Sequence, residues 1–291
     1  IIEIMDKNYW KKESEKWKMC FLAPMDGYWD SAYRQAIKSV APNIHAITEF
    51  YSADWLIHSK HLADNVLPFT EKENPLVCQI FWKDPESFAK AAKIIERYNY
   101  VGIDVNMWCP VKKVVRSWHW SWLMINTDAA FKIVEALNKA TKLPISVKTR
   151  RSFDWNQDLI DFWKGLENAW ASMITVHGRT QKQLYTWLAE RGPIYELQKS
   201  LSIPVIGNWD VMSYIDGISK VQNLAWFMIW RWSFWNPWCF LEEPENNKNE
   251  NWNWKNWVYH PTLWEILNVM SFHAEKLVET KWEHKWSLEI R

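Results

Sequence analysis

The stretch LVCQIFWKDPESFAKAAKIIERYNYVGIDVNM, residues 76–107, contains one complete repeat of the expected fold. Its first six residues form an apolar run of strand length, the middle has apolar residues at helical spacing, and residues 101–107 form a second apolar run. Asp84 is suited to cap the helix, and Pro85 is suited to its first turn. The stretch therefore predicts a strand, a helix over 84–99 and a second strand parallel to the first.

The same alternation continues along most of the chain. A further helix is predicted over 127–141, with Thr127 or Asp128 as its N-cap. The strand-like apolar runs cover residues 21–25, 45–50, 76–81, 101–107, 144–150, 172–177, 204–208 and 225–230. Eight strands alternating with helices over about 210 residues predict an α/β fold, a (β/α)8 TIM barrel with its active site at the C-terminal strand ends. A doubly wound sheet is the alternative, but it usually has fewer strands and a Gly-rich first turn.

The composition changes after Leu241. The polar stretch EEPENNKNENWNWKNW predicts a linker, and residues 260–286 have the pattern of one long amphipathic helix. We therefore expect residues 1–241 to form the barrel and residues 242–291 to form a linker and a small helical domain. A piece of fewer than about 40 residues rarely folds alone, so the helix should dock on the barrel or belong to an incomplete domain.

Charge and cysteine usage narrow the class of protein. The 35 Lys and Arg nearly balance the 34 Asp and Glu, so no global field favours nucleic acid or a membrane, although a local basic patch remains open. The four cysteines are far apart, which favours reduced thiols in a cytoplasmic protein over a disulfide framework or a zinc site. The charged N-terminus lacks the apolar core of a signal peptide. We expect a monomer that binds no metal and no membrane.

One apolar stretch, residues 224–241, is long enough to suggest a membrane helix. Arg231 and the Asn236-Pro237 pair interrupt it, and such residues are costly in lipid. We therefore interpret the stretch as part of a soluble core.

Tryptophan is unusually frequent and glycine unusually rare. The chain has 25 Trp and 7 Gly, whereas about 20 Gly are usual at this length. Many of the tryptophans lie where loops normally have glycine, and a Trp residue adopts a positive φ only at a cost. The composition indicates a fold in which many glycines have been replaced.

Polar residues follow the predicted strands, at the end where a barrel active site would lie. They are Met25-Asp26, Gln79, Asn106 with Cys109, Lys148 with Arg150, His177 with Arg179, Asn208 with Asp210, and Arg231. Each alone is weak evidence, because a buried His is usually a satisfied core residue, a free Cys a small hydrophobe and a lone Lys a surface charge. Together, at the same end of consecutive strands, they predict a ring of functional groups.

Seven segments, in order, resemble the successive motifs of the tRNA-dihydrouridine synthases. They are LAPMDGYWDSAYRQ (22–35), LVCQIF (76–81), GIDVNMWCPVKKVV (102–115), ISVKTR (145–150), ITVHGRT (174–180), IPVIGNWD (203–210) and MIWRWSFWNPW (228–238). The combination of NM-x-CP-x-x-K with HGRT is more specific than any single motif. The resemblance implies an FMN-dependent TIM barrel that reduces the C5=C6 bond of a uracil in tRNA and uses NADPH to reduce the flavin.

The family's motifs imply roles for individual residues of this sequence. The residues implied to hold FMN are Pro24, Met25 and Asp26 beside the flavin, Gln79 and Lys148 at the polar ring edge, His177 as a support, and Asn208, Trp209, Asp210, Trp230 and Arg231 at the ribityl phosphate. Cys109 is implied to be the proton donor. Asn106, Lys113 and Arg179 are implied to face the substrate. The helix near the C-terminus is compatible with the family's RNA-recognition domain.

These roles are chemically consistent. Negative charge develops at C5 of the base as hydride reaches C6, so the thiol of Cys109 should act as a general acid. The cation of Lys148 would stabilise the reduced flavin, and the target uridine must leave its stack to reach it. A basic rim for the RNA backbone would come from Lys112, Lys113, Arg116, Arg150 and Arg151.

The chain differs from the family's pattern at positions that are normally glycine. Tryptophan occupies positions 82, 108, 118, 120, 209, 230, 232 and 235. A phosphate is usually held by backbone N–H groups of glycine turns. We therefore expect the indole of Trp209 or Trp230 to fill that approach, or to strain the backbone by about 1–3 kcal/mol per site.

Two other functions are compatible with these residues. One is another FMN-dependent barrel that acts on a free pyrimidine or another small molecule, although such a ligand needs no basic rim. The other is a non-enzymatic RNA-binding protein in which the Trp-rich loop 118–122 stacks on bases.

Overall fold

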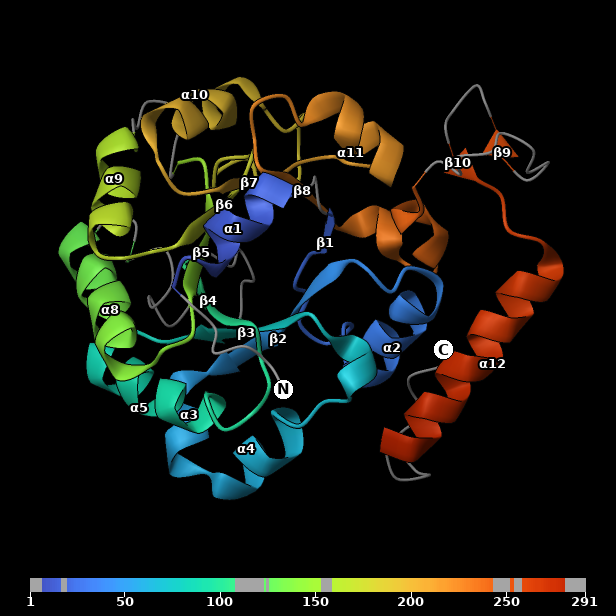
Figure 1. Cartoon of the computed structure of the whole chain (residues 1–291), viewed down its shortest axis with the longest axis horizontal. Coiled ribbons are helices and arrows are strands. Elements are labelled where there is room, and N and C mark those ends of the chain that lie inside the picture. Colours follow the sequence, from blue (N-terminus) through green and yellow to red (C-terminus); the bar gives the residue numbers. More distant parts are fainter. Residues whose placement is uncertain are drawn as a thin grey trace.

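The computed structural model describes residues 7–16, 20–107, 123, 126–152, 159–242, 252–253 and 258–280. Eight parallel strands close into a barrel in sequence order, and β1 pairs with β8 to complete it (Figure 1). The strands are β1 (Cys20–Leu22), β2 (His45–Ser52), β3 (Leu76–Phe81), β4 (Gly102–Asn106), β5 (Ile145–Arg150), β6 (Met173–His177), β7 (Val205–Asn208) and β8 (Trp226–Ile229). The predicted TIM barrel is confirmed, and the doubly wound alternative is excluded.

Helices form the outer layer of the barrel (Figure 1). They are α2 (Ser31–Val40), α3 (Ala53–His58), α4 (Lys60–Val66), α5 (Pro85–Ile95), α8 (Thr127–Ala140), α9 (Ile160–Asn168), α10 (Gly192–Ser200) and α11 (Tyr214–Lys220). The Asp84 cap is confirmed, since its carboxylate accepts from the Ser87 N–H at 2.8 Å. The predicted cap of α8 is wrong: the Asn126 side chain accepts from the Ala129 N–H at 3.2 Å. Adjacent cap-competent residues look alike in sequence, and only the backbone at Asn126 leaves the helical range.

Helix α5 is shorter than the pattern predicts. It ends at Ile95 instead of continuing to residue 99. The next turn tightens, because the N–H groups of Arg97 and Tyr98 donate to carbonyls three residues earlier. The apolar spacing continues through this turn, which explains why the sequence pattern overestimates the helix.

The stretch 224–241 forms β8 followed by two short 3-10 helices, Arg231–Ser233 and Pro237–Phe240. The expectation of core holds for β8 and for residues 237–240, whereas Trp232 and Trp235 between them are 51% and 62% exposed. Among the described helices, none combines the length and the apolar character needed to cross a membrane. The described cysteines, Cys20, Cys78 and Cys239, are buried and free.

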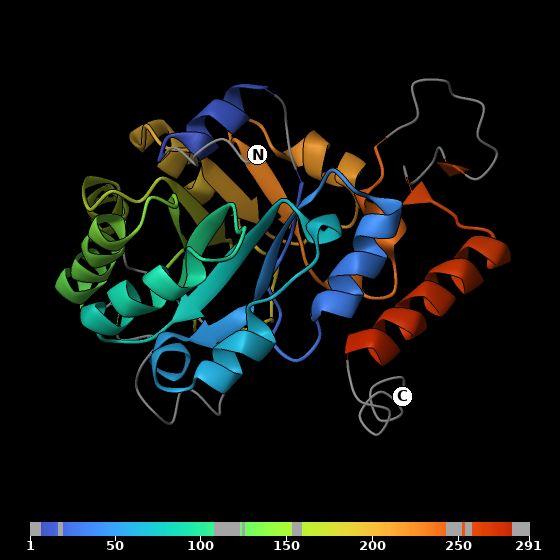
Figure 2. The same ribbon diagram turned by 60° about the horizontal axis from the view of Figure 1, so that its bottom comes forward.

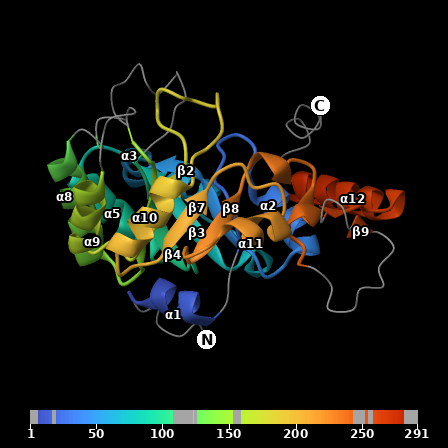
Figure 3. The same cartoon turned by 90° about the horizontal axis from the view of Figure 1, so that it is seen from above.

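Helix α1 (Tyr9–Lys16), which the sequence patterns do not predict, closes the N-terminal end of the barrel (Figure 3). Its Trp10 is fully buried, with its ring centroid 6.0 Å from those of Phe21 and Trp226. Gly102 permits this approach, because a Cβ there would lie 3.2 Å from the Trp10 ring. Figure 3 shows the loop after β6, in yellow, on the opposite side of the barrel.

Helix α12 (Leu263–Thr280) packs beside α2 at the outside of the barrel (Figure 2). It lies within the predicted helix 260–286, whose last residues are outside the described part. The ring of His273 in α12 contacts the rings of Tyr33 and Trp235, at centroid distances of 5.9 and 5.5 Å. A two-stranded hairpin, β9 (Trp252–Asn253) with β10 (Val258–Tyr259), precedes α12. The division into domains at residues 241 and 242 stays a prediction.

Three tryptophans have a backbone conformation that favours glycine. Trp170, Trp187 and Trp235 have φ values of 76°, 61° and 52°. Their side chains are 67%, 78% and 62% exposed, so they gain little from burial. A side chain held at positive φ costs about 1–3 kcal/mol. Of the described tryptophans at family glycine positions, only Trp235 has this strain.

We expect Trp170→Gly and Trp187→Gly each to stabilise the protein by about 1 kcal/mol, because relief of strain exceeds the entropy cost of glycine. The matched control is Trp55→Gly, since Trp55 is 61% exposed but lies in α3. That change should destabilise by about 0.5 kcal/mol, because glycine disfavours a helix. Urea unfolding of the three variants measures the sign, and destabilisation by all three would contradict the expectation.

Candidate functional site

A cavity of about 320 Å³ lies at the C-terminal ends of the barrel strands. Its lining includes eight of the residues that the sequence assigns to a site: Pro24, Met25, Asp26, Asn106, Lys148, His177, Asn208 and Trp230. Ala23, Tyr28, Phe50, Arg150 and Tyr185 complete it. The volume is at the lower end of the range for ligand pockets, about 300–1,000 Å³. Two larger hollows, of about 660 and 420 Å³, lie between the barrel and α12 and contain none of these strand-end residues.

Strand register brings these side chains together. Asn106 pairs with Lys148, Arg150 pairs with His177, and His177 pairs with Asn208 in adjacent strands. Alternate residues of a strand point to the same face, so Lys148 and Arg150 of β5 place these pairs in two successive rows that face the cavity. Gln79 lies one layer deeper, is fully buried, and donates its amide to Asp104 and accepts from Asn106.

His177 presents a buried hydrogen-bond donor to this cavity. Its Nδ1 accepts from the backbone N–H of Arg179 at 3.2 Å. Burial lowers the pKa of His177 well below its usual value, and the nearby cations Arg150 and Lys148 lower it further. A neutral imidazole whose Nδ1 accepts must carry its proton on Nε2. That Nε2 has no partner among the described residues, so a ligand acceptor in the cavity would satisfy it.

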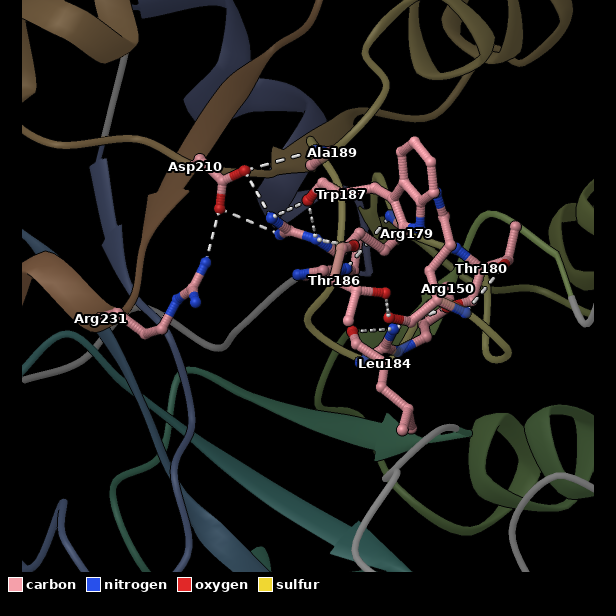
Figure 4. Close-up of polar contacts among 11 residues, drawn as sticks. Arg150, Arg179, Thr180, Leu184, Thr186, Trp187, Ala189, Asp210 and Arg231 are labelled. Carbon is pink, nitrogen blue, oxygen red and sulfur yellow. Dashed lines mark hydrogen bonds and ion pairs between the residues drawn. The ribbon is translucent and has the colours of Figure 1, made fainter.

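Asp210 links two arginines beside the cavity (Figure 4). Arg179 donates Nη1 to Oδ1 at 2.9 Å and Nη2 to Oδ2 at 2.7 Å, and Arg231 donates Nη2 to Oδ1 at 2.7 Å. Burial alone would raise the pKa of Asp210, but the hydrogen bonds and charge of Arg179 hold it below 3.8. The carboxylate therefore joins the loops that follow β6, β7 and β8.

The same arginine also shapes the loop after β6. Arg179, only 3% exposed, donates to the carbonyl of Trp187 at 3.0 and 2.8 Å. Arg150 donates to the carbonyls of Thr180 and Leu184 at 2.7 and 2.9 Å (Figure 4). Contact between Arg179 and a substrate stays a prediction. In this structure the guanidinium binds the carbonyl of Trp187 and the carboxylate of Asp210.

The indoles of Trp209 and Trp230 fill space instead of straining the backbone at positive φ. Trp209 is 4% exposed and covers Gly207, where an added Cβ would fall 1.5 Å from its ring. Trp230 lines the cavity, with its ring centroid 6.1 Å from that of His177 and 5.2 Å from that of Tyr185. Trp209 follows β7 and Trp230 follows β8, where TIM barrels frequently bind phosphate. Trp230 lines the cavity at that end, whereas Trp209 packs over Gly207 in the hydrophobic core.

Several predicted residues cannot be placed. Cys109 and Lys113, together with Lys112, Arg116 and the loop 118–122, lie outside the described residues. Their roles stay predictions. No group of three His, Cys, Asp or Glu side chains that could hold a metal ion occurs in the described ranges.

Sequence reasoning missed Asp104, which lies inside the barrel below the cavity. It is fully buried, and burial raises its pKa while bonds from Ser146 and Gln79 and the charge of Lys148 oppose that rise. Its signal was present in the sequence, because Asp104 precedes Asn106 by two residues and so points to the same face.

Comparison with known proteins gives one family. The family model described as Dihydrouridine synthase (Dus) matches residues 21–291. A probable tRNA-dihydrouridine synthase 1 of Synechocystis is 33% identical over 202 residues, which are 69% of this chain and 57% of that protein. The tRNA-dihydrouridine synthase B of Pasteurella multocida is 30% identical over 261 residues, 88% of this chain and 76% of that protein. A probable tRNA-dihydrouridine synthase of Rickettsia conorii is 29% identical over 89% of this chain and 77% of its own length.

Solved structures with the same architecture are more distant in sequence. A complex of 2-naphthoyl-CoA reductase with 2-naphthoyl-CoA has a TM-score of 0.56 and 10% identity, covering 76% of this chain and 48% of that one. Histamine dehydrogenase from Rhizobium has a TM-score of 0.54 and 12% identity, covering 75% of this chain and 44% of that one. At these identities they support the fold alone.

We expect Asp210→Asn to lower stability by about 2 kcal/mol, because it leaves the buried Arg179 without its counter-charge. Glu190→Gln is the matched control: Glu190 pairs with Arg151 at 3.0 Å but is 46% exposed, so its loss should cost less than about 1 kcal/mol.

The pH dependence of stability gives a second measure of the same carboxylate. Because the folded pKa of Asp210 is depressed, its contribution is complete above the ordinary value of 3.8 and is lost as the pH falls through the folded pKa. The difference in stability between wild type and Asp210→Asn should therefore be constant from pH 7 down to about pH 5 and then shrink as the pH falls below 3.8. A difference that stays constant down to about pH 3 would contradict this assignment.

Proposed function

The chain belongs to the dihydrouridine synthase family, and on this premise we propose that it reduces uridine to 5,6-dihydrouridine in tRNA, with FMN as its flavin and NADPH as the reductant. The observation that carries the proposal is the convergence, on one cavity at the strand ends, of eight residues for which the motifs imply contact with FMN or the substrate. Enzymes of TIM-barrel fold have their active sites at this end.

The residues present fit the ring of a flavin. Pro24, Met25 and Phe50 give the cavity apolar surface, while Lys148, Asn106 and Asn208 provide polar groups. The unpartnered Nε2–H of His177 offers a hydrogen bond to a ring acceptor. Such a combination of apolar surface with a few placed polar groups is typical of cofactor sites. The flavin, when bound, supplies the hydride that reduces the pyrimidine.

The protein's own groups provide positioning and charge. The ammonium of Lys148 favours negative charge on the edge of a ring beside it. His177 stays neutral, because burial and neighbouring cations oppose its protonation, and it can therefore donate a hydrogen bond but not a net charge. Cys109 supplies the proton to C5 of the base as a general acid.

At the phosphate end, Arg231 is a cation that a ligand can reach. It is 44% exposed, its guanidinium bonds to Asp210 at 2.7 Å, and it lies 5.2 Å from the ring centroid of Trp230. A phosphate held there would share Arg231 with Asp210, since a guanidinium has five donors. The indole of Trp230 lines the cavity at this end of the proposed FMN site.

Substrate recognition is proposed to use both parts of the chain. Asn106, Lys113 and Arg179 would face the flipped uridine, and residues 242–291 would contribute to tRNA recognition. A cytoplasmic location belongs to the same proposal, because its partner is tRNA. A monomeric state is proposed with it.

The first test is the visible spectrum of the purified protein, followed by addition of NADPH and unmodified tRNA. We expect flavin absorption, bleaching by NADPH and appearance of dihydrouridine by mass spectrometry of digested tRNA. A protein that cannot be loaded with FMN would exclude the proposal. Equal turnover of free uracil and tRNA would instead support a small-molecule oxidoreductase, and tight RNA binding without flavin would support a binding protein.

The second test concerns Cys109. We expect Cys109→Ala to retain flavin and its reduction by NADPH but to lower uridine reduction by about 100-fold or more, the usual size of a general-acid contribution. Cys109→Ser should also be slow, because a hydroxyl is a far weaker acid than a thiol. Wild-type rates in either variant would remove Cys109 from the mechanism.

A further inference from the structure

A buried hydrogen-bonded row crosses three strands directly below the cavity. Gln79 of β3 pairs in register with Asp104 of β4, which pairs with Ser146 of β5. All three are fully buried. Two residues further along their strands, Asn106 and Lys148 form the next pair and line the cavity. The row therefore supports the floor of the site without being part of its lining.

The hydrogen bonds of this row all donate toward Asp104 or toward the residue that binds it. Ser146 donates its hydroxyl to Oδ1 of Asp104 at 2.6 Å, and Gln79 donates Nε2 to Oδ2 at 2.7 Å. Asn106 then donates Nδ2 to Oε1 of Gln79 at 3.1 Å. A carboxylate only accepts, so the amide of Gln79 must turn its NH₂ group toward Asp104 and its carbonyl toward Asn106. That carbonyl in turn draws the NH₂ group of Asn106.

The carboxylate is costly at this position. An acidic group without water is stable only when donors and positive charge surround it. Here burial raises the pKa of Asp104, whereas the bonds from Ser146 and Gln79 and the charge of Lys148 lower it. A neutral amide or an aliphatic side chain would fill the same layer at less cost, but it would not impose a single direction on Gln79.

We propose that Asp104 is a positioning residue that fixes the orientation of the Gln79 and Asn106 amides and thereby the hydrogen-bond pattern that the cavity floor offers a ligand ring. The proposal rests on the proposed function only for the identity of that ring. Removing the carboxylate lets the amide of Gln79 turn over, because an amide at position 104 both donates and accepts. Asn106 then loses the acceptor that holds its NH₂ group toward Gln79.

The orientation is tested first without any ligand. In the NMR spectrum of the apoprotein, the side-chain NH₂ groups of Gln79 and Asn106 should give single sets of signals. In Asp104→Asn the Asn106 signals should shift and double or broaden. Unchanged Asn106 signals in a folded Asp104→Asn protein would overturn the proposal.

The functional consequence is tested by FMN titration and by the visible spectrum of the bound flavin. We expect Asp104→Asn to weaken FMN binding roughly 3- to 10-fold, the range for a lost hydrogen bond between neutral groups, because the ring is contacted by the amide of Asn106 and not by the carboxylate, and to shift the flavin absorption maximum. Ser146→Ala is the matched control, because it removes the other partner of Asp104 and leaves Gln79 and Asn106 in place. It should lower stability but change FMN affinity less than about twofold, within the precision expected of an uncoupled site.

The double variant Gln79→Glu/Asp104→Asn distinguishes an effect on the orientation of Asn106 from an effect on folding. It keeps one carboxylate in the row, and the new Glu accepts from both the amide at 104 and Asn106. We expect it to restore the single Asn106 signal even if Asp104→Asn alone unfolds. Equal effects of Ser146→Ala and Asp104→Asn on FMN binding, or failure of the folded double variant to restore the signal, would reduce Asp104 to a structural residue. A wild type that binds no FMN would refute the proposed function, while the NMR comparison would still decide the role of Asp104.

Discussion

Closure of the parallel sheet between β1 and β8 determines which side chains of this chain can meet. In a closed barrel every strand has two neighbours, and a shift of one residue in any strand would turn its inward side chains outward. Register therefore places Asp104 beside Gln79, Asn106 beside Lys148 and Arg150 beside His177. The cavity follows from these pairs, because its lining comes from the last inward position of several strands.

The barrel interior changes in polarity from one end to the other. Trp10, Phe21 and Trp226 form an aromatic cluster at the end closed by α1. The row around Asp104 follows, and the cations Lys148 and Arg150 lie at the mouth. This order explains why His177 is neutral, since it lies among cations in a buried layer. Both carboxylates accept hydrogen bonds from side chains of the protein: Asp104 from Gln79 and Ser146, and Asp210 from two arginines. Neither carboxylate lines the cavity.

The strands could be predicted closely because their apolar runs are short and bounded by polar or turn residues. Helix ends were less certain: α5 ends early in a tight turn, and Asn126 caps α8 in place of its neighbours. Helix α1 could not be predicted from apolar spacing, because it is a short polar helix in which Trp10 is the buried residue. Eight of the residues with an implied role lie around the cavity. Asp104 was not predicted, because it lies one layer below the strand ends on which the prediction was based.

The three tryptophans at positive φ have a consequence for the substitutions that the fold tolerates. At Trp170, Trp187 and Trp235 the backbone has the shape that glycine adopts without strain, and the side chains are largely in solvent. The fold is carried elsewhere, by buried strand residues and by tryptophans such as Trp10 and Trp29. Glycine at these three positions would therefore relieve the backbone without removing a core side chain, whereas glycine in place of Trp10 or Trp29 would leave a large cavity in the core. The loops of this barrel thus tolerate an exchange between two residue types that its core excludes.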